Sequence, residues 1–224
     1  METNPVRSPA LPAPLAAATE RVFAGLSASR GSRIFHPQGI AFRAVVRVEE
    51  GAPLPAGTHD AVVRLSRGLG LVRGWPEFLG LALRIGGQDL LLASSAPSPL
   101  VRMAPLPARS FFGTTLSSLL PFRAGGRVVL VGALVRGTPT EDDDQLDEVV
   151  ATPGPVTADL LATELGGPWR RFGTLELGER LPDGEADRLR FDPWNCAGGL
   201  VPHGFVNRLR APAYRGSRRG RPSA

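Results

Sequence analysis

The stretch Leu79–Ala93, LGLALRIGGQDLLLA, places two short apolar runs on either side of a Gly86-Gly87 pair. Two such runs around two consecutive glycines predict a β-hairpin, because glycine tolerates the positive φ angles of a tight turn. The predicted strands are Leu79–Ile85 and Asp89–Ala93. A hairpin joins neighbouring strands of an antiparallel sheet, so this stretch favours an antiparallel fold.

Further strand patterns lie on both sides of this hairpin. Residues Gly39–Glu49 alternate bulky apolar and other side chains, as in a half-buried strand. The 27 glycines and 22 prolines predict many turns between short elements. We therefore expect an α+β fold, an antiparallel β-barrel with a few short helices. The other predicted strands are Ala61–Ser66, Arg127–Arg136 and Arg171–Leu177, and the predicted helices are Glu20–Ser29 and Val156–Glu164.

The length of 224 residues suits one domain with its own core. Residues 1–19 are rich in proline and alanine and are expected to form a flexible arm, which leaves 20–224 as a single barrel domain. The segment Glu141–Glu148 has six carboxylates in eight residues and is expected to be an exposed, solvated loop.

Composition excludes several classes of protein. A single cysteine excludes an internal disulfide, a CxxC redox site and a zinc finger. No apolar run approaches the roughly 18 residues that a membrane span needs. The expected location is the cytoplasm.

All 26 basic residues are arginines, and six of them lie in the last seventeen residues. The other 20 nearly balance the 21 acids. A nucleic-acid-binding protein spreads positive charge along a face, so no nucleic-acid partner is expected. A local arginine cluster fits a small multi-anionic ligand, and a disordered basic tail is the alternative.

The sequence lacks the catalytic motifs of several common enzyme classes. No phosphate-binding GKS or GKT, no GxSxG and no HExxH occurs in the chain. His59-Asp60 is similar to the metal-binding pair of some phosphohydrolases, which leaves a metal-dependent phosphodiesterase as the weakest hypothesis. Cys196 is expected to be a buried structural thiol.

Two residues remain as candidates for chemistry. His36 precedes the first predicted strand, and Tyr214, the sole tyrosine, lies four residues after Arg210 and four before Arg218. A phenolate at pH 7 needs a pKa lowered by about three units, roughly 4 kcal/mol. Nearby arginines supply part of this and a bound ferric ion would supply the rest, so Tyr214 is a candidate iron ligand. An exposed tyrosine in the C-terminal tail is the alternative.

Several segments together resemble the catalase superfamily, in particular its short bacterial catalase-like members. Arg33-x-x-His36-x-x-Gly39 is similar to the distal segment of that family, and Arg64-Leu65-Ser66 to its Arg-Phe-Ser strand. Arg210, Tyr214, Ser217 and Arg221 fall at the four positions of the proximal haem-ligand pattern. Other similar segments are Leu79–Arg84, Gln88–Ser95, Phe191–Asn195, Pro202–Gly204 and Asn207–Tyr214.

The resemblance implies non-covalent haem b with Tyr214 as the iron ligand and Arg210 hydrogen-bonded to the phenolate. It implies that His36 acts as a general base on peroxide and that Ser66 orients its imidazole. It further implies that Arg33, Arg64 and Arg221 bind the haem propionates and that Ser217 belongs to the cofactor-binding pattern.

The chain departs from the catalase pattern at one catalytic position. Ser94 and Ser95 stand where catalases have an asparagine that assists the distal histidine. We therefore expect peroxidase-type or weak catalase activity on hydrogen peroxide or organic peroxides. The expected co-substrate is an unidentified organic reductant, and the expected partner is a second copy of the chain in a homo-oligomer. A rival alignment places Asn207–Tyr214 on a catalase segment that binds no iron. In that case the protein is a haem-free barrel that serves as a binding or scaffold module.

Overall fold

The predicted hairpin forms as the glycine pair requires. In this computed structural model, β3 (Leu79–Ile85) and β4 (Gln88–Ser95) pair across Gly86 and Gly87, whose φ angles are 53° and 77°. Two positive φ angles match the twist of a two-residue hairpin turn. The structure describes residues 38–68, 75–139 and 144–204, all within one compact unit of residues 34–224. The predicted arm at 1–19 and the helix Glu20–Ser29 lie outside the described residues.

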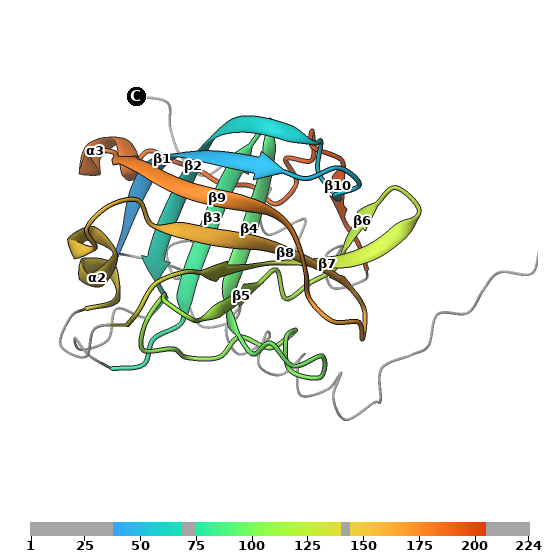
Figure 1. Ribbon diagram of the computed structural model, residues 1–224, viewed down its shortest axis with the longest axis horizontal. Helices are drawn as coiled ribbons and strands as arrows, with labels where there is room; N and C mark the ends of the chain where they lie inside the picture. The colour runs from blue at the N-terminus through green and yellow to red at the C-terminus, as the bar shows by residue number, and fades with distance from the viewer. Residues whose placement is uncertain (1–37, 69–74, 140–143, 205–224) are drawn as a thin grey trace, which may run out of the picture. The chain divides into compact units, whose positions relative to one another are not determined.

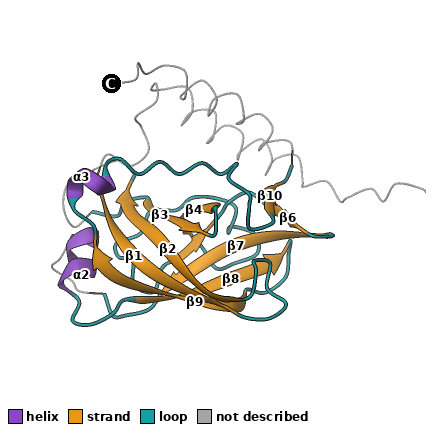
Figure 2. Ribbon diagram, turned by 90° about the horizontal axis from the view of Figure 1, so that it is seen from above, coloured by secondary structure: helices purple, strands orange, loops and turns teal. Residues whose placement is uncertain are grey.

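Eight strands form a closed antiparallel barrel in the order β7-β5-β4-β3-β2-β1-β9-β8, and pairing of β7 with β8 closes it (Figure 1). Strands β6 and β10 extend this sheet beyond β7. They lie at one end of the barrel, and helices α2 and α3 lie at the other (Figure 2). The predicted fold class is confirmed. The remaining elements are β1 (Gln38–Val48), β2 (Gly57–Arg67), β5 (Thr115–Ser117), β6 (Phe122–Ala124), β7 (Arg127–Val135), α2 (Gln145–Ala151), β8 (Thr157–Glu164), β9 (Arg170–Arg180), α3 (Asp183–Ala186) and β10 (Leu200–Pro202).

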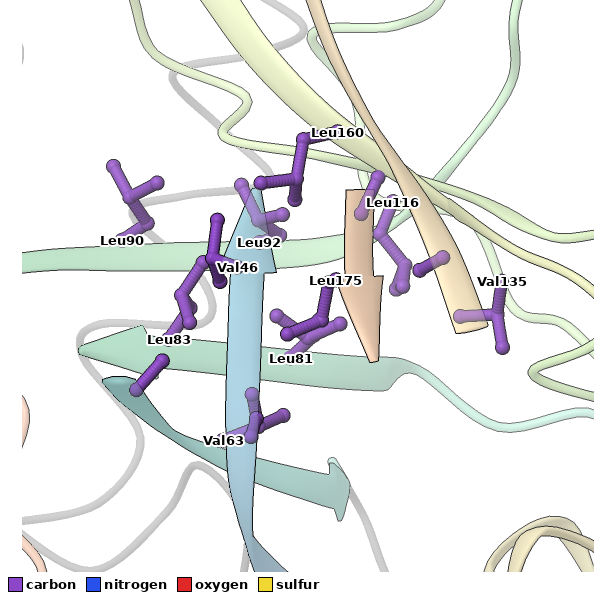
Figure 3. Close-up of a cluster of buried hydrophobic side chains, with 14 of the residues drawn as sticks. Val46, Val63, Leu81, Leu83, Leu90, Leu92, Leu116, Val135, Leu160 and Leu175 are labelled. Carbon is purple, nitrogen blue, oxygen red and sulfur yellow. The ribbon is translucent and has the colours of Figure 1, made fainter. Parts of the chain in front are cut away.

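Apolar side chains from every barrel strand fill the interior (Figure 3). Val63, Leu83 and Leu90 are fully buried and come from three successive strands. A void of about 10 Å³ lies among the side chains that include Leu65 and Leu175, which is room for one water at most. A void of this size is far too small for a porphyrin.

The helix predicted at Val156–Glu164 is wrong, because the segment forms strand β8. Leu160 and Leu161 are both buried, and the pairing of β8 with β9 shifts register between them. A β-bulge of this kind interrupts the alternation of buried and exposed residues. The apolar residues 156, 160 and 161 then have the spacing of a helix.

The prediction of an exposed loop at Glu141–Glu148 is also wrong for its second half. Asp144 is buried, forms an ion pair with buried Arg67 of β2, and caps α2 by accepting a hydrogen bond from the Leu146 N–H. Glu148, 2% exposed, accepts hydrogen bonds from the Ser110 hydroxyl at 2.7 Å and from the Phe111 N–H at 2.8 Å. These carboxylates hold α2 against the end of the barrel. In the described part of the chain, no helix is long and apolar enough to span a bilayer.

The fully buried carboxylate of Asp89 ties the β3–β4 hairpin to the chain after α3. It accepts two hydrogen bonds from Arg84, at 2.7 and 2.8 Å. It also accepts hydrogen bonds at 2.8 Å from the Asp192 N–H and the Asn195 side-chain amide. The Phe191 ring lies 5.0 Å from the Arg84 guanidinium carbon. One carboxylate therefore fixes the course of residues 190–195 across the outside of the hairpin.

We expect Asp89→Ala to lower the free energy of unfolding by about 3 kcal/mol, because it removes four hydrogen bonds, two of them to a guanidinium. Glu176→Ala is the matched control, since it breaks the exposed pair with Arg47 and should cost less than about 1 kcal/mol. Urea denaturation of both variants measures the difference. Equal losses would contradict the anchoring role of Asp89.

Candidate functional site

A row of small residues crosses the outer face of the barrel. The register pairs these residues directly, strand to strand, over β1, β2, β3, β4, β5 and β7. No side chain in the row is larger than a serine hydroxymethyl, so other groups can approach the backbone closely there. Ser66 and Ser117 are only 4% and 0% exposed, so the row is covered rather than open to solvent. The row consists of Gly39, Ser66, Gly80, Ala93, Ser117 and Gly132.

Arg64 stands beside this small-residue row on β2, between the small neighbours Ala41 and Ala82. A Cβ atom at Gly39 would lie 2.7 Å from the Arg64 guanidinium carbon and 2.7 Å from the Leu65 carbonyl oxygen. The guanidinium therefore occupies the space that the missing side chain of Gly39 leaves open. Glycine at this position is needed for the observed placement of Arg64.

The chain after β9 covers the next part of the outer face. Leu181, Ala186 and Leu189 pack against Ala41 and Val62. This packing forms one border of the area that contains the small-residue row.

The charges near Arg64 come from the same covering segment. Burial lowers the pKa of the Arg64 guanidinium, the carboxylate of Asp187 opposes this effect, and the positive charge of Arg190 adds to it. Asp187 and Arg190 were not identified from the sequence. No local motif identifies these two residues, because they come near Arg64 only through the course of the chain after α3.

Ser66 lies in the small-residue row itself and is 4% exposed. Its hydroxyl is 3.4 Å from the Gly80 carbonyl oxygen, a long and weak hydrogen bond. Ser66 pairs with Gly39, which follows His36 by three residues in the sequence. The structure thus brings predicted site residues Arg64 and Ser66 together on one face.

Ser94 and Ser95 have other contacts. The Ser94 hydroxyl accepts a hydrogen bond from the Leu79 N–H at 3.0 Å and donates one to the Leu106 carbonyl at 2.6 Å. The Ser95 hydroxyl lies 2.8 Å from the Ala104 carbonyl oxygen. Both hydroxyls hold the loop that follows β4, and a part for them in peroxide chemistry stays a prediction.

The other predicted site residues lie outside the described residues. On the distal side these are Arg33 and His36. The same holds for the predicted proximal residues Arg210, Tyr214, Ser217 and Arg221.

The pair His59-Asp60 gives no support to a phosphodiesterase site. Consecutive residues of a strand point to opposite faces, so these two side chains diverge from β2. The His59 Nε2 atom lies 2.9 Å from the carbonyl oxygen of Pro55. Over residues 38–68, 75–139 and 144–204, no group of three or more His, Cys, Asp or Glu side chains could hold a metal ion.

Cys196 is half-buried rather than buried, and its thiol lies 3.8 Å from the Pro193 carbonyl oxygen. Burial raises the pKa of this thiol, and the negative charge of Asp192 raises it further. The thiol is therefore a poor nucleophile at neutral pH.

Comparison with solved structures gives clear fold relatives. A fungal catalase matches with a TM-score of 0.55 at 11% identity, over 98% of this chain and 64% of its own. Catalase A from Saccharomyces cerevisiae matches with a TM-score of 0.54 at 10% identity, over 98% of this chain and 65% of its own. The chain has a catalase-like fold. It spans just under two thirds of these catalases.

At 10–11% identity this similarity establishes the fold alone. No protein-family model matches the sequence, and no curated protein matches it with significance. The catalase-like barrel implied by the sequence resemblance is thus confirmed as a fold.

We expect alkylation of Cys196 to rise with pH at a midpoint above that of a free cysteine, because the folded protein disfavours the thiolate. Asp192→Asn should move the midpoint to lower pH, since it removes a negative charge while keeping a side-chain oxygen to accept the hydrogen bond of the Trp194 N–H. Iodoacetamide labelling followed by mass spectrometry measures both profiles. An unshifted midpoint in the variant would contradict the assigned influence of Asp192.

Proposed function

We propose that the chain binds haem b non-covalently on the outer face of β1–β4 and has peroxidase-type or weak catalase activity on hydrogen peroxide or organic peroxides. The observation that carries this proposal is the small-residue row with Arg64 beside it. The apolar side chains that fill the described barrel interior support this location.

The described residues fit a planar macrocycle with acidic side chains. Ser66 and Gly80 present nothing larger than a hydroxymethyl group on two adjacent strands, and the Arg64 guanidinium lies over the neighbouring Gly39. The guanidinium of Arg64, half-buried there, suits a haem propionate, because arginine binds carboxylates through two parallel hydrogen bonds. Among the described side chains of the interior, the void of about 10 Å³ is far too small for haem.

The sequence resemblance supplies the other haem contacts of the proposal. Tyr214 would ligate the iron as a phenolate, and Arg210 would donate a hydrogen bond that stabilises the phenolate charge. Arg33 and Arg221 would bind propionates together with Arg64, and Ser217 would complete this contact set. When bound, haem supplies the iron centre at which a peroxide O–O bond is cleaved.

His36 and Ser66 would handle the proton of the substrate. His36 accepts a proton from one peroxide oxygen and returns it to the other, as a general base and then a general acid. The hydroxyl of Ser66 orients the imidazole, and its long contact to the Gly80 carbonyl leaves its proton available for a ring nitrogen. Ser94 and Ser95 stand in place of an asparagine amide, and their hydroxyls donate to the Leu106 and Ala104 carbonyls instead. A reducing organic co-substrate, rather than a second peroxide, would therefore complete the turnover.

Haemin titration of the purified full chain tests cofactor binding. We expect a Soret band with the charge-transfer features of tyrosinate ligation, which Tyr214→Phe alters. Arg64→Gln should weaken haemin binding roughly tenfold, the effect of losing one charged hydrogen bond. The matched control is Arg127→Gln, an exposed arginine at the β6–β7 turn.

An unchanged spectrum in Tyr214→Phe would remove Tyr214 as the ligand. Equal weakening by Arg64→Gln and Arg127→Gln would remove Arg64 from the cofactor site. A folded wild-type chain that does not bind haemin at all would favour the haem-free binding or scaffold module instead.

The proton-handling step has its own test. We expect His36→Ala to retain haemin but to lower kcat/KM for hydrogen peroxide by about 100-fold or more, the usual contribution of a general acid–base group. Turnover is followed with a chromogenic phenol as the reductant. Retained kcat/KM in the variant would exclude His36 from the mechanism.

A further inference from the structure

Arg102 is a buried arginine with no carboxylate partner among the residues that the structure describes. Its side chain is 1% exposed and lies in the loop between β4 and β5. Its Nε and Nη2 atoms are 3.5 Å and 3.3 Å from the carbonyl oxygens of Ser98 and Pro97, which are long contacts. In the part of the chain that the structure describes, Nη1 has no hydrogen-bond partner. A buried charge in such surroundings is costly.

Trp169 provides a second unsatisfied donor at the same place. The Arg102 guanidinium carbon stands 4.8 Å from the centre of the Trp169 ring. The indole Nε1 atom is buried and also has no partner among residues 38–68, 75–139 and 144–204. Trp169 packs against Gly132, where a Cβ atom would lie 3.0 Å from its ring. The two donors therefore belong to one site, over the β7 end of the small-residue row.

The loop that carries Arg102 is held in place by hydrogen bonds. The Ser95 hydroxyl donates to the Ala104 carbonyl at 2.8 Å, and the Arg102 N–H donates to the Ser98 carbonyl at 3.0 Å. The buried guanidinium is thus part of an ordered turn rather than an accident of a loose segment. Burial also lowers the pKa of Arg102, as expected for a cation without a nearby negative charge.

Exposed apolar side chains lie on the two segments that carry these donors. Leu100 is 79% exposed and Leu165 is 55% exposed. Val101 and Leu106, from the same loop as Arg102, are 40% and 38% exposed. Together they make up most of the large apolar side chains that the described residues expose. An unsatisfied cation next to such side chains suits a ligand with one acidic group and an apolar body.

We propose that Arg102 and Trp169 form a binding site for the carboxylate of a small apolar monocarboxylic acid. The two carboxylate oxygens accept hydrogen bonds from Arg102 Nη1 and Trp169 Nε1, and the apolar chain lies on Leu100 and Val101. Both donor atoms are buried, so the ligand must displace the groups that cover them. Trp169 packs on Gly132 of β7, whereas haem is proposed on β1–β4, so hexanoate binding is tested separately from haem binding.

The test uses hexanoate as the probe and the full chain with Trp75→Phe and Trp194→Phe, which leaves Trp169 as the sole indole. At constant ionic strength, we expect hexanoate to change Trp169 fluorescence saturably, while hexanol at equal concentration binds at least tenfold more weakly. Arg102→Gln should weaken hexanoate binding at least tenfold. Arg188→Gln is the matched control, because this exposed arginine lies just after α3 and should leave binding unchanged.

Calorimetry with Trp169→Phe keeps the test decisive if Arg102→Gln does not fold. This variant retains an aromatic ring below the guanidinium but lacks the indole N–H, and hexanoate affinity should fall severalfold. The proposal is overturned if hexanoate does not bind saturably, if hexanol binds as tightly, or if Trp169→Phe binds hexanoate like the wild type.

Discussion

Closure of the sheet through β7 and β8 is the constraint on which the rest of the structure depends. A closed barrel of eight strands leaves an interior just wide enough for its own side chains. In the described residues, apolar side chains, mostly leucine, valine, alanine and phenylalanine, fill most of that space. The small-residue row and Arg64 lie on the outer face.

The sequence predicted the fold class well where strands keep a regular alternation. The strand β3 was predicted to the residue, because the Gly86-Gly87 turn fixes its end. The strand β8 was predicted as a helix, because a bulge between Leu160 and Leu161 disturbs its alternation. Buried charges were also missed, since Asp144 and Glu148 look like members of an acidic loop until their partners on distant elements are known.

The candidate site was predicted in part. Arg64 and Ser66 could be identified from a short motif, and the structure places them together on one outer face. The straight row from Gly39 to Gly132 depends on register between strands far apart in sequence, which no local pattern reveals. For the same reason, the sequence does not reveal that Arg190 lies near Arg64 or that Trp169 packs against Arg102.

Pairing of β1 with β9 has a consequence for biosynthesis. Arg47 and Glu176, which form an ion pair between these two strands, are 129 residues apart in the chain. At roughly 5–20 residues per second, the ribosome needs on the order of ten seconds to make that interval. During this time one edge of β1 lacks its partner and can pair with another nascent chain. Alternate outward arginines on β1, such as Arg43 and Arg47, supply the charge that discourages such aggregation.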